Sequence, residues 1–139
     1  MSANLDLVRS IYADWERGDF SSIDWADPEI EFVIPDGPAP GRGTGVAALV
    51  AAWRDFLSVW EDYRYVADEF REIDDAQVLV PGHAVGGHGK ASRVELGQVD
   101  RGRGANLFHI RAGRVAKLVL YWDRDRAFAD LGLTPEGGE

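Results

Sequence analysis

The strongest indication of the fold class is the segment Phe108-His109-Ile110-Arg111-Ala112-Gly113-Arg114-Val115. Ala112-Gly113 separates two runs that contain apolar residues, and this pattern predicts a β-hairpin. We predict antiparallel strands on both sides of this turn, at residues 63–73, 77–85, 94–110 and 114–122. Short turns, such as the one at residues 86–89, join them. Because residues 94–110 are too many for one flat strand, we expect a bulge or kink near residues 102–104.

The first half of the chain has the periodicity of helices. Apolar residues recur at helical spacing over residues 5–17 and residues 46–60, with Asn4 and Thr44 as N-caps. The shorter predicted elements are a helical turn at residues 20–25, a strand at residues 29–34, a Pro/Gly-rich loop up to Gly45 and a closing helix at residues 124–131. This order predicts a single α+β domain over residues 1–139, with helices packed on one strongly curved sheet.

The composition fits one folded, acidic domain. Hydrophobic residues make up 45% of the 139 residues and five residues are tryptophans, which suggests an aromatic core or a cavity lined with rings. The formal net charge of −9 argues against a nucleic-acid partner, because phosphate binding needs basic patches. The first residues lack a signal-peptide pattern, and no apolar run approaches the ~18 residues that span a bilayer. We therefore expect a soluble cytoplasmic protein without a membrane partner.

No metal or cofactor site is expected from the sequence. The chain has no cysteines, and its three histidines, His83, His88 and His109, share no metal-binding spacing. The glycine-rich residues 41–45 lack the Gly-Lys-Ser/Thr ending and the βαβ unit of a phosphate-binding loop. His83 has two interpretations: an acid or base that lines a pocket, or an ordinary strand histidine.

Asp36 is the candidate proton-transfer residue. It lies in the loop Ile34-Pro35-Asp36-Gly37-Pro38-Ala39-Pro40-Gly41, between the predicted strand and the tryptophan-rich second helix. Pro-Asp-Gly is a strong turn signal, so one interpretation is a simple turn residue. The other is a base, because a carboxylate held on a stiff loop near aromatic rings can be tuned for proton transfer. The local sequence leaves both interpretations open.

Several segments resemble one known superfamily. They are Tyr12 on the first helix, Gly18-Asp19-Phe20 at its exit, residues 43–49 at the next helix, the hairpin at residues 108–115 and the ending Tyr121-Trp122-Asp123. Over nearly the whole chain they resemble the nuclear transport factor 2-like superfamily, in its SnoaL-like and ketosteroid isomerase-like branch. The resemblance implies a cone-shaped, curved, mixed but mainly antiparallel sheet wrapped around the N-terminal helices, which is the cystatin-like architecture.

The resemblance also implies a catalytic trio. Asp36 falls where ketosteroid isomerases place their base, Tyr12 at their hydrogen-bonding tyrosine, and Asn106 where they hold a protonated aspartic acid. In such a trio the carboxylate takes a proton alpha to a carbonyl, while the phenol and the amide N–H donate to the developing enolate. Two positions depart from the superfamily's patterns. Trp53 replaces a second tyrosine, and Leu120 stands where polyketide cyclases and epoxide hydrolases place an essential aspartate.

Strand alternation predicts which side chains share a face of the sheet. Inward-facing residues would line an apolar, aromatic chamber or fill a solid core. They are Trp15, Trp53, Phe56, Phe108, Leu118, Leu120 and Trp122, joined by His83 if it lines the pocket. On the outer face Leu107, Val119 and Tyr121 are expected, and an exposed apolar surface there favours a homodimer.

These patterns predict a domain that binds a small apolar molecule. One hypothesis is a cofactor-independent isomerase or cyclase that moves a proton alpha to a carbonyl. The alternative is a non-catalytic ligand-binding domain, or a dimeric scaffold domain, of the same fold.

Overall fold

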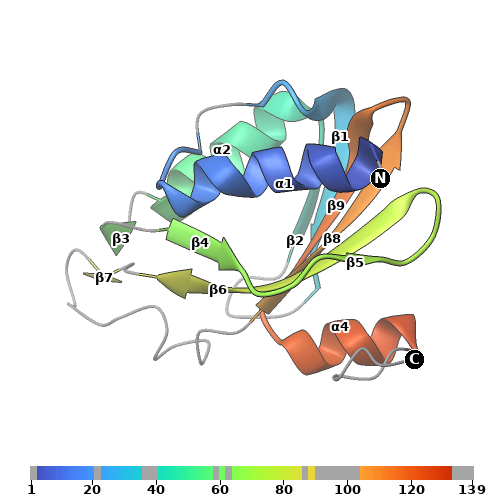
Figure 1. Ribbon diagram of the computed structural model, residues 1–139. Helices are drawn as coiled ribbons and strands as arrows, with labels where there is room; N and C mark the ends of the chain where they lie inside the picture. The colour runs from blue at the N-terminus through green and yellow to red at the C-terminus, as the bar shows by residue number, and fades with distance from the viewer. Residues whose placement is uncertain are drawn as a thin grey trace.

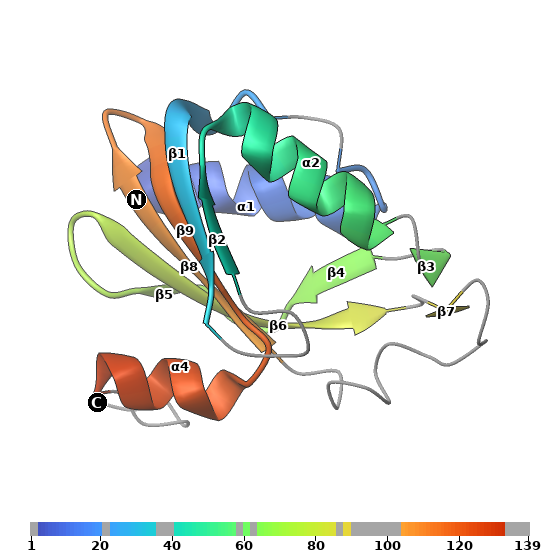
Figure 2. The ribbon, with the colours of Figure 1, turned by 180° about the vertical axis from the view of Figure 1, so that it is seen from behind.

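The computed structural model describes residues 3–20, 23–35, 41–57, 60–61, 64–85, 88–89 and 104–132. One curved sheet separates two helical layers (Figures 1 and 2). Helices α1 (Ala3–Glu16) and α2 (Val46–Leu57) pack on one face, and α4 (Arg124–Leu131) packs on the other. The predicted α+β class with a curved sheet is confirmed. No helix within the described ranges is long and apolar enough to cross a membrane.

The main sheet has seven strands, and the β-hairpin predicted around residues 108–115 lies at its centre. Its order is β2 (Gly41–Thr44), β1 (Ala26–Ile34), β9 (Arg114–Tyr121), β8 (Gly104–Arg111), β6 (Gln77–Val85) and β4 (Arg64–Ala67), with β5 (Arg71–Glu72) also paired to β6. β1 runs parallel to β9, and the other pairs of this sheet are antiparallel. Two short strands, β3 (Trp60–Glu61) and β7 (His88–Gly89), form a separate ladder.

Side chains of the central hairpin alternate between the faces as predicted. On β8, Asn106 and Phe108 face α1, whereas Leu107 packs on the α4 side. On β9, Leu118 faces the N-terminal helices and Val119 faces α4. The register of this hairpin slips between His109 and Ile110, which places an irregularity near the turn. Of the segment where we expected a bulge, residues 102–103 lie outside the described part of the chain.

The inner core lies between the sheet and the two N-terminal helices. Helix α1 buries one face through Val8, Ile11, Tyr12 and Trp15, which follow the helical period. The chief buried partners from α2 and the sheet are Leu49, Ile30, Phe32, Val78, Val80, Phe108 and Leu118. Each fully buried side chain of this size contributes about 1.5–3 kcal/mol, so this core fixes the two helices on the sheet.

The outer core lies between the sheet and α4. Ala127 and Phe128 of α4 are buried, and they cover Leu107, Val119 and Tyr121 on the sheet. These three sheet residues are the ones on which the homodimer prediction rested. The chain's own C-terminal helix buries them, so the expectation that they form an exposed apolar surface is wrong.

Local interactions define both ends of α4, so its predicted range, residues 124–131, is confirmed. At its start, Asp123 is the N-cap and its carboxylate accepts a hydrogen bond from the backbone N–H of Asp125 at 3.0 Å. At its end, Gly132 adopts the left-handed conformation, with φ of 67°, that favours glycine after a helix.

Two predicted elements are shorter than expected. The strand predicted at residues 63–73 is divided into β4 and β5, because the chain bends after Ala67 and the Asp68 N–H donates to the Pro81 carbonyl at 2.8 Å. The helix predicted at residues 46–60 ends at Leu57. Beyond it, Trp60 pairs with Gly89 in the β3–β7 ladder. The two strands of this ladder lie where we predicted the end of a helix and a turn.

Strand β2 was predicted as part of a loop. It forms an edge strand because Gly43 lies against the ring of Phe32 on β1; a Cβ atom at Gly43 would sit 2.6 Å from that ring. Glycine therefore allows the close approach that the aromatic side chain requires. Its neighbour Arg42 adds an exposed ion pair to Glu31 at 3.1 Å.

Candidate functional site

The candidate site is a hydrogen-bonded pair of side chains inside the inner core. The amide Nδ2 of Asn106 donates to the hydroxyl oxygen of Tyr12 at 2.8 Å, although the two residues are 94 positions apart in the sequence. Tyr12 is 1% exposed and Asn106 is 6% exposed. Among the described residues, Asn106 is the only buried residue with an amide or charged side chain. Two members of the predicted catalytic trio therefore lie in direct contact.

Strand register and helix phase place this pair. Asn106 lies in the middle of the sheet, opposite Val80 of β6 and Leu120 of β9. Its side chain leaves the sheet on the inner face, where α1 presents Tyr12. An amide in such a setting needs a partner, because an unpaired buried polar group costs about 1–3 kcal/mol.

Aromatic rings surround the Tyr12 phenol. Its ring centroid lies 4.9 Å from that of Trp15, 5.8 Å from Phe70, 5.9 Å from Phe108 and 6.0 Å from Tyr65. Tyr65 and Phe70 were missed in the sequence, where the segment from residue 68 to 75 was dominated by charged side chains. On β4, Tyr65 and Ala67 are two positions apart and both pack on the inner core. This alternation could have indicated from the sequence that Tyr65 faces inward.

The tryptophans extend this cluster toward α2. The Trp15 ring lies 5.3 Å from Trp53 and 6.2 Å from Trp25, and Phe20 stacks on Trp15 at 5.8 Å. Edge-to-face contacts at such distances each add about 0.5–1.5 kcal/mol to area burial. The predicted lining residues Trp15, Trp53 and Phe108 thus belong to one cluster, and Leu118 and Leu120 pack in the same core.

Three other predicted residues are placed less fully. Asp36 lies outside the described residues, and so does the side chain of Phe56. Trp122 follows β9 and is partly exposed.

His83 lies on the outer face of the sheet, away from the Tyr12–Asn106 pair. On β6, Val78 and Val80 face the inner core, whereas Leu79 faces the outer core. Because neighbouring side chains alternate, His83 falls on the same side as Leu79. The interpretation that His83 lines the inner pocket is therefore wrong.

His109, also on the outer face, is held largely uncharged at neutral pH. Burial lowers the pKa of His109 below its ordinary value of 6.5, and the nearby Lys117 cation lowers it further, while Asp74 and Glu31 act in the opposite direction. Within the described ranges, no group of three or more His, Cys, Asp or Glu side chains is placed to hold a metal ion.

Residues 8–118, a span that includes both Tyr12 and Asn106, match the SnoaL-like domain. The chain belongs to the SnoaL-like domain family. The predicted SnoaL-like resemblance is confirmed, and the chain shares the fold of a nuclear transport factor 2-like protein. No curated protein matches this SnoaL-like domain significantly.

Solved structures share the fold of this SnoaL-like domain. A nuclear transport factor 2-like protein of unknown function from Burkholderia pseudomallei is 19% identical with a TM-score of 0.70, over 93% of this chain and 97% of that chain. A candidate polyketide cyclase from Xanthomonas campestris is 17% identical with a TM-score of 0.61, over 93% and 96%. TerC, co-crystallised with polyporic acid, is 20% identical with a TM-score of 0.68, over 94% and 98%. At these identities the similarity concerns the fold.

A double-mutant cycle tests how much the buried pair stabilises this SnoaL-like domain. Tyr12→Phe removes the acceptor of the Asn106 amide, so we expect a loss of about 1–3 kcal/mol in the free energy of unfolding. Asn106→Leu removes the donor and should also destabilise. The double variant should lose less than the sum of the single variants, by at least about 0.5 kcal/mol, because the one hydrogen bond that joins the pair is lost in each single variant and cannot be lost twice. Urea unfolding measures all four proteins, and strictly additive losses would contradict the expectation.

Proposed function

We propose that this SnoaL-like domain binds a small, largely apolar molecule that carries a carbonyl group, and that it transfers a proton alpha to that carbonyl. The carrying observation is the buried hydrogen bond between Tyr12 and Asn106. It places polar groups in a core otherwise built from apolar and aromatic side chains. Burying an amide is unfavourable without a partner, so a pair in this place favours a functional role over simple packing.

The proposed chemistry assigns one role to each residue of the trio. Asp36 is the base that removes the proton. Tyr12 donates its hydroxyl hydrogen to the carbonyl oxygen as negative charge develops there. Asn106 donates to the Tyr12 oxygen, which strengthens the phenol as a donor because hydrogen bonds in a chain polarise one another. An amide is a weaker donor than a protonated carboxylic acid, so less enolate stabilisation is expected than in ketosteroid isomerases.

Two of the structural neighbours support a small-molecule ligand. One is the candidate polyketide cyclase, and the other is TerC with polyporic acid. The aromatic walls around Tyr12 fit a flat, poorly soluble ligand. Because Tyr12 is 1% exposed, a ligand that reaches its hydroxyl has to displace ring contacts.

Ligand binding to the purified domain tests the proposal. Near-ultraviolet circular dichroism and calorimetry would follow titration with polyporic acid and with a phenolic steroid. We expect saturable binding that changes the aromatic signal, since the ligand must rearrange the rings around Tyr12. Tyr12→Phe should weaken binding about tenfold, the effect of one lost hydrogen bond of about 1.4 kcal/mol.

Tyr121→Phe is the matched control for this titration. It removes the same hydroxyl group from the outer face, where Tyr121 donates to Asp130 at 3.0 Å. Its affinity should equal that of the unmodified domain. Equal affinities for all three proteins would exclude Tyr12 from the ligand site.

The alternative is a non-catalytic ligand-binding or dimeric scaffold domain. The dense ring packing in the inner core favours a scaffold, because the tryptophan rings contact one another and need no ligand to fill the space between them. A scaffold should bind neither probe, and its oligomeric state can be measured by analytical ultracentrifugation.

A further inference from the structure

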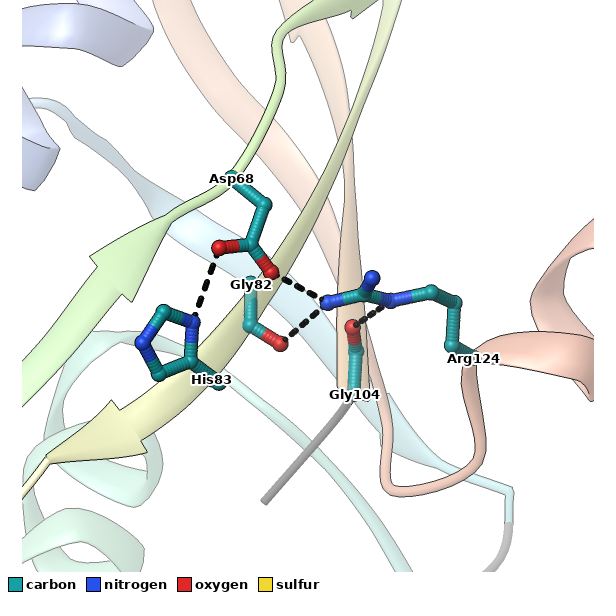
Figure 3. A network of polar contacts seen from close by, with 5 residues as sticks. All are labelled: Asp68, Gly82, His83, Gly104 and Arg124. Atoms are coloured by element: carbon teal, nitrogen blue, oxygen red, sulfur yellow. Dashed lines mark hydrogen bonds and ion pairs between the residues drawn. The ribbon is translucent and has the colours of Figure 1, made fainter. Parts of the chain in front are cut away.

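A second polar network lies on the outer side of the sheet, between the ends of β4, β6, β8 and the start of α4 (Figure 3). The carboxylate of Asp68 uses both of its oxygens. Oδ1 lies 2.8 Å from Nδ1 of His83, and Oδ2 lies 2.5 Å from Nη2 of Arg124. Arg124 also donates to the carbonyl oxygens of Gly82 at 2.8 Å and Gly104 at 3.2 Å. Asp68 and Arg124 are 56 positions apart, and no local pattern in the sequence predicts their contact.

Backbone pairing makes this network rigid. Gly82 and Gly104 are direct partners in the β6–β8 ladder, so one guanidinium binds two strands at the same level. The Asp68 backbone N–H donates to the Pro81 carbonyl at 2.8 Å, which fixes the carboxylate beside β6. The Arg124 side chain is 14% exposed, which protects these bonds from solvent.

The geometry also indicates which ring nitrogen of a neutral His83 carries the hydrogen. A carboxylate held by arginine only accepts hydrogen bonds, so the hydrogen of a neutral imidazole lies on Nδ1. Nε2 then carries the lone pair and points away from Asp68 (Figure 3). The His83 side chain is 37% exposed, so solvent and a small reactant can reach it.

We propose that His83 is the general base of a second site, one that hydrolyses neutral aryl esters of small carboxylic acids with water. Nε2 takes a proton from water as the water oxygen forms a bond to the ester carbonyl carbon. The tetrahedral intermediate then breaks its bond to the phenolate oxygen, which receives the proton from the imidazolium. The products are a carboxylic acid and a phenol. Asp68 stays ionised throughout and is a positioning residue that orients and stabilises the imidazolium.

Charge favours an uncharged ester over an anionic one. Within the network the Asp68 carboxylate and the Arg124 guanidinium balance each other, which leaves no spare cation to bind an anion. The whole chain carries a formal net charge of −9, which repels anionic substrates. This site lies on the opposite face from the Tyr12–Asn106 pair, so the proposal does not depend on the function of that pair.

The rate of p-nitrophenyl acetate hydrolysis by the full chain tests the proposal. We expect a protein-dependent rate above buffer that falls at least about tenfold in His83→Gln, within the range for loss of a general base. His109→Gln is the control, because it removes another partly buried histidine from the same face. Its rate should stay within about twofold of the unmodified chain. The proposal is overturned by no rate above buffer, by an unchanged rate in His83→Gln, or by an equal loss in His109→Gln.

Asp68→Asn tests whether Asp68 orients His83 for the reaction or only contributes to the stability of the fold. We expect at least about a tenfold loss of rate, seen in kcat rather than in KM, because the His83 ring is no longer held in position by the carboxylate. If this variant does not fold because Arg124 is released, His83→Gln still tests the base, since it leaves the Asp68–Arg124 ion pair in place. Nitrogen-15 NMR of the unmodified chain gives an independent readout. A neutral His83 with its hydrogen on Nε2 would overturn the proposal.

Discussion

Phe128→Ala is expected to destabilise the domain by about 3–5 kcal/mol, because it removes the largest side chain that α4 buries. Phe128 is 4% exposed and packs on Leu107 and Val119 in the outer core. Its ring also lies 5.3 Å below the guanidinium carbon of Arg71, so a cation–π contact is lost together with the buried area. For a domain of this length the loss corresponds to roughly 10–20 °C in melting temperature.

Urea unfolding followed by circular dichroism measures this loss. Ala129→Ser is the matched control, since Ala129 is exposed on the same helix, and its stability should change by less than about 0.5 kcal/mol. A second result should follow from the uncovered sheet face. Phe128→Ala should self-associate at high concentration, because Leu107 and Val119 become accessible when α4 is loosened. A loss below about 1 kcal/mol would mean that α4 contributes little to the fold.

The central hairpin and its alternation could be predicted because they depend on local pattern. Side chains two positions apart on β8 share a face, so one residue taken as inward assigns the others on that strand. Asn106 and Phe108 were assigned to the same face in this way. Phe108 packs in the inner core, and Asn106 is hydrogen-bonded to Tyr12 on the same side of the sheet. The closing helix was predictable for a similar reason, since Asp123 and Gly132 carry its start and stop signals.

The face of the sheet on which His83 lies could not be predicted, because the sequence of β6 does not alternate between apolar and polar residues. Val78, Leu79 and Val80 are all fully buried, two toward the inner core and one toward the outer core. A strand buried on both faces has a continuous apolar run, so alternation cannot tell which side is which. The phase became visible only with the position of α4, and that position depends on contacts between residues far apart in the sequence.

The same limit applies to the candidate site. The contact between Tyr12 and Asn106 joins residues 94 positions apart, and no local pattern predicts it. The family resemblance suggested it, by assigning both residues to one oxyanion-binding site. The Asp68–Arg124 ion pair joins residues 56 positions apart, and it had neither a local pattern nor a resemblance to suggest it.

Asp36→Asn is expected to lower turnover of a β,γ-unsaturated ketosteroid by about 10²–10⁴-fold, if Asp36 is the base. Asparagine keeps the size of the side chain, but its amide oxygen does not hold a proton at neutral pH. KM should change little, because Tyr12, supported by Asn106, remains in place to bind the carbonyl oxygen. The loss should therefore appear in kcat, as expected for a group that acts only in the transition state.

Asp24→Asn is the control for this comparison, because Asp24 is an exposed aspartate and the substitution makes the same change in net charge. Its kcat should equal that of the unmodified domain, and ultraviolet absorbance of the conjugated product would measure all three proteins. Equal turnover in Asp36→Asn and Asp24→Asn would remove the base assignment. An unmodified domain that binds the steroid but forms no product would instead favour the non-catalytic alternative, in which Tyr12, supported by Asn106, recognises a carbonyl and no residue removes a proton. The two outcomes differ because binding depends on the donor pair, whereas turnover also requires a group that accepts the proton.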